Sequence, residues 1–176
     1  MIIFLHGRGF TLIELLIAIC IFLILTLIAV PSFNKQILDS RLTANVHSLV
    51  NSLHYARNLA LNNNTTITIC PFSANNSVQC GNDWTNGWIV ITQPSSDAPT
   101  LLKSEQNLSE QITVKSLATR ITFNSQGVVG SQSNFTLCDT RGSQFARSLT
   151  IMASGFIQSG NVPGQSVWNS APLTCP

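Results

Sequence analysis

Residues 10–30 form an apolar run of 21 residues in which Glu14 is the only carboxylate. A helix that crosses a bilayer needs about 20 predominantly apolar residues, so this run predicts a membrane-spanning helix. A charge at membrane depth costs about 2.5–3.5 kcal/mol even on the mildest scale. Glu14 is therefore a candidate functional residue. The alternative is a carboxylate that is tolerated near the lipid headgroups.

The helical pattern continues beyond Pro31. Apolar residues recur there at steps of three to five positions with polar residues between them, which predicts an amphipathic helix. The apolar positions are Phe33, Ile37, Leu42, Val46, Leu49, Leu53 and Ala60. Three Asn residues at 62–64 predict the end of the helix, because Asn tolerates the left-handed conformation common at that position. Pro31 has no backbone N–H and predicts a bend within the helix.

After residue 64 the chain changes to short β-rich runs separated by Gly, Pro, Asn and Ser, a pattern typical of strands joined by turns. The predicted strands are residues 65–70, 88–92, 101–103, 112–115, 121–123, 128–129, 135–138, 148–152 and 156–158. These runs predict an α+β fold in which two antiparallel sheets, or one strongly curved sheet, pack on the helix. Residues 159–176 are rich in Gly, Pro, Ser and Asn and predict an irregular tail.

Composition limits the kinds of partner. Only 9% of the residues are charged, and from Ser32 onward eight Lys or Arg stand against six Asp or Glu, a net charge of +2. This balance excludes a nucleic-acid binder that relies on net charge alone. The roughly 145 residues beyond the apolar run are a common size for one domain with its own core.

The five cysteines indicate an oxidising compartment. Cys20 lies in the apolar run, and four more follow it: Cys70, Cys80, Cys138 and Cys175. Four cysteines permit three pairings. Proximity in the sequence favours Cys70 with Cys80, which closes a polar loop, and Cys138 with Cys175, which ties down the carboxyl terminus. Such disulfides fit an exported domain. The alternative is that some of these cysteines remain free or bind metal.

A catalytic constellation or a Gly-rich phosphate loop cannot be found in the sequence. His47 and His54 are seven residues apart and share a helix face, but no neighbouring residue completes a recognisable metal or triad spacing. We interpret both as polar helix residues. The sequence predicts no enzyme activity, no cofactor and no metal ion.

The run Gly9-Phe10-Thr11-Leu12-Ile13-Glu14, followed by an apolar helix and Pro31, resembles the type III signal sequence of type IV pilins and type II secretion pseudopilins. The resemblance implies that a prepilin peptidase removes residues 1–9 by cutting after Gly9, and methylates the new amino terminus at Phe10. Glu14 would then be the fifth residue and could pair with a neighbouring subunit's ammonium in a filament. Such a pair can fix the register between subunits, because a slip leaves an uncompensated charge.

The rest of the chain resembles the GspH/FimT family of minor pilins and pseudopilins. The matching residues are Cys70-Pro71, Cys80, Trp84, Gly87-Trp88-Ile89-Val90, a Phe-x-x-x-Gly segment at 123–127 and an Arg-Ser-Leu strand with a following Ser-Gly at 147–155. The resemblance implies a type IV pilin fold. We interpret Trp84 and Trp88 as packing residues; the alternative is a site where they stack on a ligand.

Together these patterns predict four segments. Residues 1–9 are a leader, 10–31 a transmembrane and filament-core helix, 32–61 the periplasmic half of the same helix, and 62–176 a β-rich globular domain. The amino terminus is expected to start in the cytoplasm, with the globular domain in the periplasm. Expected partners are the prepilin peptidase, other major and minor pilins or pseudopilins, the inner-membrane assembly platform and the lipid bilayer.

Two functions are consistent with the resemblance. The first is a structural subunit that primes or caps a type IV pilus or a type II secretion pseudopilus, and the alternative is a tip module that binds DNA or another ligand. Relatives linked to DNA uptake carry Gly-Arg-x-Arg where residues 155–158 read Gly-Phe-Ile-Gln. Arg141 and Arg147 could make weak DNA contacts, but basic residues are scattered along the sequence, and phosphate binding needs several that converge. DNA binding is therefore not favoured.

Overall fold

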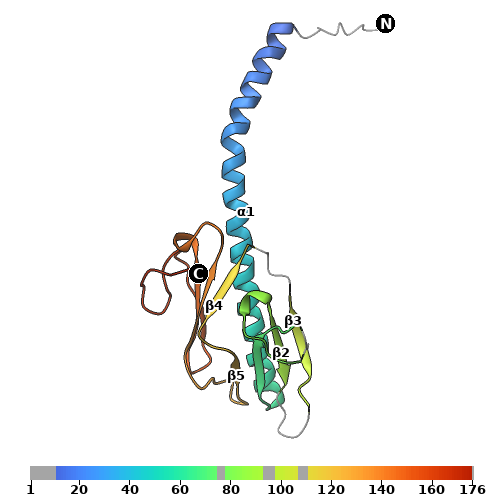
Figure 1. Ribbon diagram of the computed structural model, residues 1–176, viewed down its shortest axis with the longest axis vertical. Coiled ribbons are helices and arrows are strands. Elements are labelled where there is room, and N and C mark those ends of the chain that lie inside the picture. The colour runs from blue at the N-terminus through green and yellow to red at the C-terminus, as the bar shows by residue number, and fades with distance from the viewer. Residues whose placement is uncertain (1–10, 75–77, 93–97, 107–110, 176) are drawn as a thin grey trace, which may run out of the picture. The chain divides into compact units, whose positions relative to one another are not determined.

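The computed structural model describes residues 11–74, 78–92, 98–106 and 111–175, without the side chains of 28–32. It divides into an N-terminal unit, Met1–Leu38, and a globular unit, Asp39–Pro176. One helix, α1 (Leu12–Asn63), contributes to both (Figure 1). The leader, Gly9 and Phe10 lie outside the described residues.

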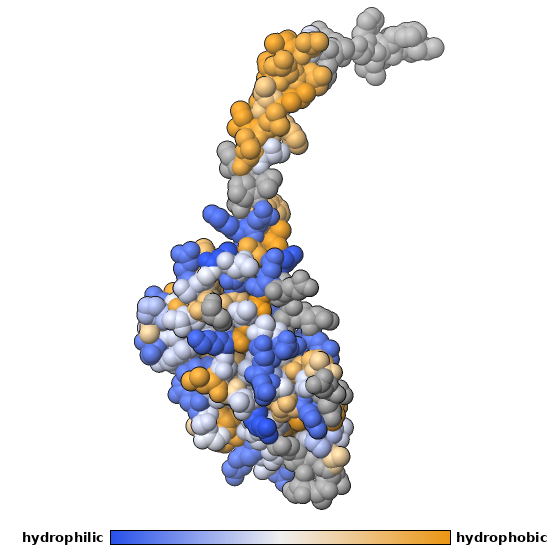
Figure 2. All heavy atoms as spheres, in the orientation of Figure 1, coloured by the Kyte–Doolittle hydropathy of each residue, from blue (hydrophilic) through white to orange (hydrophobic). Residues whose placement is uncertain are grey.

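The described part of the N-terminal unit is a helical segment with apolar side chains on its surface, which appear as the orange stretch in Figure 2. Between Leu12 and Leu27 the large apolar side chains are 51–84% exposed. Over the described part of the chain, no helix meets the length and hydropathy required to cross a membrane. The helix is uninterrupted at Pro31, and the bend expected there stays a prediction.

The later part of α1 is amphipathic, as its sequence pattern predicts. Leu42, Leu49 and Leu53 are completely buried, as are the small residues Ala56 and Ala60. The helix ends as the three Asn residues predict. Asn64 has a left-handed φ of 49°, and the N–H of Thr65 donates to the carbonyl of Ala60 at 3.2 Å. This bond over five residues satisfies one of the last carbonyls of the helix.

Two antiparallel sheets of four strands pack on this part of α1, which confirms the α+β prediction. One sheet has the order β3-β2-β1-β5 and the other β4-β6-β7-β8. The strands are β1 (Ile67–Pro71), β2 (Trp88–Thr92), β3 (Leu101–Glu105), β4 (Thr113–Ser116), β5 (Ile121–Phe123), β6 (Ser133–Cys138), β7 (Arg147–Ile151) and β8 (Ile157–Ser159). Two short 3₁₀ helices, η1 (Trp84–Asn86) and η2 (Ser143–Phe145), complete the unit.

One predicted strand is wrong. Residues 128–129 belong to an irregular segment after β5, because Asn124 organises a turn there. Its side-chain oxygen accepts the N–H groups of Gln126 and Val128, both at 3.0 Å. Such local bonds compete with a strand ladder. The other eight predicted strands are present, with ends shifted by no more than two residues.

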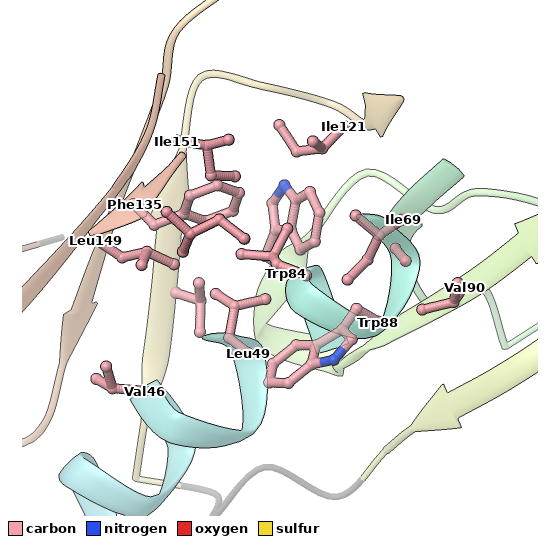
Figure 3. Packing of buried hydrophobic residues seen from close by; sticks show 14 of the residues in the cluster. Val46, Leu49, Ile69, Trp84, Trp88, Val90, Ile121, Phe135, Leu149 and Ile151 are labelled. Carbon is pink, nitrogen blue, oxygen red and sulfur yellow. The ribbon is translucent and has the colours of Figure 1, made fainter. Parts of the chain in front are cut away.

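The main core lies between α1 and the inner faces of both sheets (Figure 3). Trp84 and Trp88 are 2% and 0% exposed, which confirms that they are packing residues. The ring of Trp84 packs edge to face against that of Phe135, with the ring centres 4.9 Å apart. Its Nε1 donates to the carbonyl of Ala118 at 2.7 Å. Most buried indoles have such a partner for the N–H, but Nε1 of Trp88 is buried without one.

Each sheet also has an apolar cluster on its outer face, and a disulfide belongs to each. Cys70–Cys80 packs with Ile89 and Ile91 on the first sheet. Cys138–Cys175 packs with Leu173 on the second. Both disulfides pair as proximity in the sequence favours. They hold irregular segments over faces that would otherwise be open to water.

Candidate functional site

Glu14 lies in the first turn of α1, with its side chain exposed. Its backbone N–H donates to the hydroxyl of Thr11 at 3.3 Å. This is the geometry of an N-terminal cap, and a carboxylate in the first turn also interacts favourably with the helix dipole. Thr11 and Glu14 therefore help to start the helix, and the Glu14 carboxylate stays accessible to another molecule.

Arg141 and Arg147, although separated in sequence from Asp39 by about a hundred residues, meet at its carboxylate. Nη2 of Arg147 is 3.3 Å and Nη2 of Arg141 is 3.7 Å from Oδ1 of Asp39. Arg141 also binds Asp139 at 2.6 Å and lies over the ring of Phe145, with its guanidinium carbon 4.4 Å from the ring centre. The structure thus places two guanidiniums beside two carboxylates.

The carboxylates of this cluster change the pKa of Arg141. The hydrogen bond with Asp139 is the main cause that raises the pKa of Arg141 above its ordinary value, while burial acts in the opposite direction. The negative charges of Asp139 and Asp39 raise this pKa further. Arg147 also donates from Nη1 to the carbonyl of Asn161 at 3.0 Å.

These contacts correct the view that the basic residues are scattered. Arg141 and Arg147 do converge, but each guanidinium is paired with Asp39, and Arg141 with Asp139 as well. Since the two positive charges are matched by two negative ones, the cluster offers little net charge to a phosphate. It instead ties the loop between β6 and β7 to α1.

The other candidate cations lie on different elements, Lys103 in β3, Lys115 in β4 and Arg120 just before β5. Lys103 binds the hydroxyl of Ser52 at 3.0 Å and approaches Glu105 at 3.7 Å. Lys115 and Arg120 are exposed and lie on either side of Leu117. Residues 155–158 run from the β7–β8 turn into β8, carry no basic side chain and expose Phe156.

The remaining candidates are the two tryptophans, which are packing residues, and the two histidines, which lie on the surface. Trp84 and Trp88 are buried and cannot stack on a ligand. His47 and His54 are exposed on α1. No group of three or more potential metal ligands occurs in the part of the chain that the structure describes.

Sequence reasoning missed the roles of Asp39 and Asp139. For Asp139 a local signal exists, since Oδ1 accepts the N–H of Arg141 two residues later at 2.9 Å, an Asx turn that Asp-Thr-Arg-Gly permits. For Asp39 there is none, because its bond with Arg147 spans 108 positions.

Comparison with known families gives two matches. Residues 45–155, well over half of the chain, match the family described as type II transport protein GspH. Residues 6–30 match the prokaryotic N-terminal methylation motif. No curated protein matches the chain.

Two solved structures share the fold. The crystal structure of the type IV minor pilin FimU from Pseudomonas aeruginosa has a TM-score of 0.58 at 22% identity, covering 69% of this chain and 89% of FimU. The minor pseudopilin EpsH from the type 2 secretion system of Vibrio cholerae has a TM-score of 0.52 at 9% identity, covering 68% of this chain and 96% of EpsH. At these identities the likeness shows the fold alone.

Proposed function

The chain belongs to the GspH/FimT family of minor pilins and pseudopilins, and we propose that it is a minor subunit that primes or caps a type IV pilus or a type II secretion pseudopilus. In this role it acts as a structural component and not as an enzyme. The observation that carries the proposal is the exposed apolar surface of the N-terminal unit.

That surface is larger than a soluble monomer normally leaves open. Every large apolar side chain from Leu12 to Leu25 is at least half exposed. Contiguous apolar patches of more than a few hundred Å² mark sites of association with protein or membrane. Packing against the equivalent helices of other subunits would cover this surface in a filament.

Processing by a prepilin peptidase is the second part of the proposal. The match to the methylation motif at residues 6–30 supports a cut after Gly9 and methylation of Phe10. The new amino terminus would be an ammonium, and Glu14 of a neighbouring subunit would pair with it. The proposed location before assembly is the inner membrane, at its assembly platform, with the globular unit in the periplasm, where both disulfides would persist.

The charge cluster does not favour the alternative role as a DNA-binding tip module. Arg141 and Arg147 are engaged with Asp39 and Asp139, so a phosphate would have to displace a carboxylate. We therefore propose that DNA binding is weak and strongly salt-dependent. An anisotropy titration at physiological salt tests this point, and sub-micromolar binding that Arg141→Ala with Arg147→Ala abolishes would reverse it.

The experiment that tests the proposal measures the mass and the location of the chain in its own cells. We expect a mature chain that begins at methylated Phe10 and is recovered in sheared pili or with the secretion apparatus. Gly9→Val serves as the control that should retain the leader. An intact leader on the wild-type chain, in cells with an active prepilin peptidase, would contradict the proposal.

A further inference from the structure

One end of the globular unit gathers most of the large apolar side chains that the unit leaves exposed. In the second sheet the antiparallel register pairs Ser116 with Phe135, Ser133 with Ile151, and Ile151 with Ile157. The segments that continue from these strand ends therefore emerge on the same side. They carry Leu117, Val128, Met152 and Phe156, which are 99%, 36%, 42% and 53% exposed.

The end of α1 reaches the same place. A Cβ added to Gly127 would come within 3.0 Å of the Leu61 side chain, which is 44% exposed. We call these five residues the end patch: Leu61, Leu117, Val128, Met152 and Phe156. Among the described residues of the globular unit, three other large hydrophobic side chains are exposed: Tyr55, Leu101 and Val162.

The end patch rests on a rigid support. Gly127 and Gly155 both have positive φ, and a Cβ on Gly155 would come within 2.0 Å of the carbonyl oxygen of Gly127. The two turns thus pack backbone against backbone. Arg57 on α1 ties them together, because Nε donates to the carbonyl of Gly127 at 3.0 Å and Nη2 to that of Ser154 at 3.4 Å. A surface held in this way loses little conformational entropy when a partner binds.

The chemistry of the end patch indicates an apolar partner. In and beside the described segments that form this end, the charged side chains are Arg57, which binds carbonyl groups, and Lys115 and Arg120, which lie on either side of Leu117. Two exposed cations are too few for a nucleic acid, whose binding strengthens as several cations contact phosphates. The surface therefore fits a protein with an uncharged apolar face.

The size of the end patch limits the kind of protein that can bind to it. It consists of five side chains, of which only Leu117 and Phe156 are more than half exposed, and the largest apolar patches on monomers, about 300–600 Å², are often functional. A stable complex between two free proteins buries about 800 Å² on each partner. The occupant must therefore already be held nearby, where a high effective concentration makes a smaller contact sufficient.

We propose that the end patch binds the globular domain of another subunit in the same filament. This inference rests on the proposed function, because the partner's helix packs with the N-terminal unit and supplies the high effective concentration. The end patch then selects which subunit is placed next to this one.

A photo-crosslinking experiment on the full chain in its own cells tests the inference. The residue p-benzoylphenylalanine replaces Phe156 in one strain and Val162 in the control. Val162 is equally exposed, at 54%, but its neighbour Asn161 binds Arg147 at the opposite end of β7 from Met152. We expect position 156, and not position 162, to crosslink to a protein that itself has a prepilin-type amino terminus. Crosslinks from position 156 to nucleic acid or lipid only, or none at all, would overturn the inference.

A double variant gives a second readout. Leu117→Ser with Phe156→Ser should leave processing and the melting temperature unchanged but lower recovery in sheared filaments at least tenfold, whereas Val162→Ser should match the wild type. Recovery of the double variant at the level of Val162→Ser would overturn the inference and leave the proposed function intact. A wild-type chain that is absent from every filament fraction would contradict the proposed function and the inference with it.

Discussion

The two parts of α1 have opposite surroundings, although they belong to one helix. From Leu12 to Leu27 large apolar side chains are found on all sides of the helix and are exposed by 51–84%. From Leu42 to Ala60 most of the apolar side chains occupy one face and are covered by the two sheets, while Tyr55 is exposed. The later part therefore completes the fold of its own chain. The earlier part has an apolar surface that this chain does not cover, and so its sequence is suited to association.

This contrast predicts a large loss of stability for a Leu→Ala substitution in the later part and almost none in the earlier part. Leu53 is completely buried and Leu16 is 52% exposed. Leu53→Ala should lower the free energy of unfolding by about 2–5 kcal/mol, because it removes buried methyl groups and leaves a cavity. Leu16→Ala should change it by less than about 0.5 kcal/mol. Denaturant unfolding of the processed chain in mild detergent measures both, and equal losses would show that the earlier part also supports the fold.

The disulfides sharpen the contrast, because both stabilise the globular unit alone. Replacing Cys138 and Cys175 by Ser should lower its free energy of unfolding by about 2–4 kcal/mol. Replacing Cys70 and Cys80 should cost about 1 kcal/mol less in the chain-entropy description. The reason is that their loop spans 10 positions, compared with 37 for the other. Unfolding curves of the two Ser pairs test this order, which equal or reversed losses would contradict.

The charge cluster should contribute less to stability than either disulfide. The side chain of Asp39 is 45% exposed, so water screens its interactions with Arg141 and Arg147. Asp39→Asn should lower the free energy of unfolding by up to about 1 kcal/mol. Glu105→Gln, which removes only the exposed pair with Lys103, is the matched control and should cost less. A loss of several kcal/mol for Asp39→Asn would mean that the cluster is a main support of the globular unit.

Local signals in the sequence predicted much of the fold. The apolar spacing indicated which face of α1 is buried, the three Asn residues marked its end, and proximity favoured the observed cysteine pairs. These features depend on residues close together in the chain. The segment after β5 shows the limit, because Val128 and Val129 have high strand propensity, yet the Asn124 side chain and the positive φ of Gly127 make a turn.

The features that sequence reasoning missed depend on distant contacts. Asp39 receives two arginines only after β6 and β7 have packed on α1. The end patch likewise requires the register of the second sheet to bring Leu117 and Phe156 to one side. Glu14, in contrast, could be identified without any knowledge of the fold, because a carboxylate in an apolar run is unusual.

The most direct test of the contrast is the incorporation of Glu14→Ala into filaments. This substitution makes the exposed part of α1 more apolar, so association driven by apolar burial alone would be unchanged or improved. If Glu14 pairs with a neighbour's amino terminus, Glu14→Ala should be processed normally and its free energy of unfolding should be unchanged. Its recovery in sheared filaments should nevertheless fall at least about tenfold, because a buried ammonium is left uncompensated. Quantitative immunoblots of sheared and cell-bound fractions measure this ratio. Equal recovery of Glu14→Ala and wild type would contradict the account.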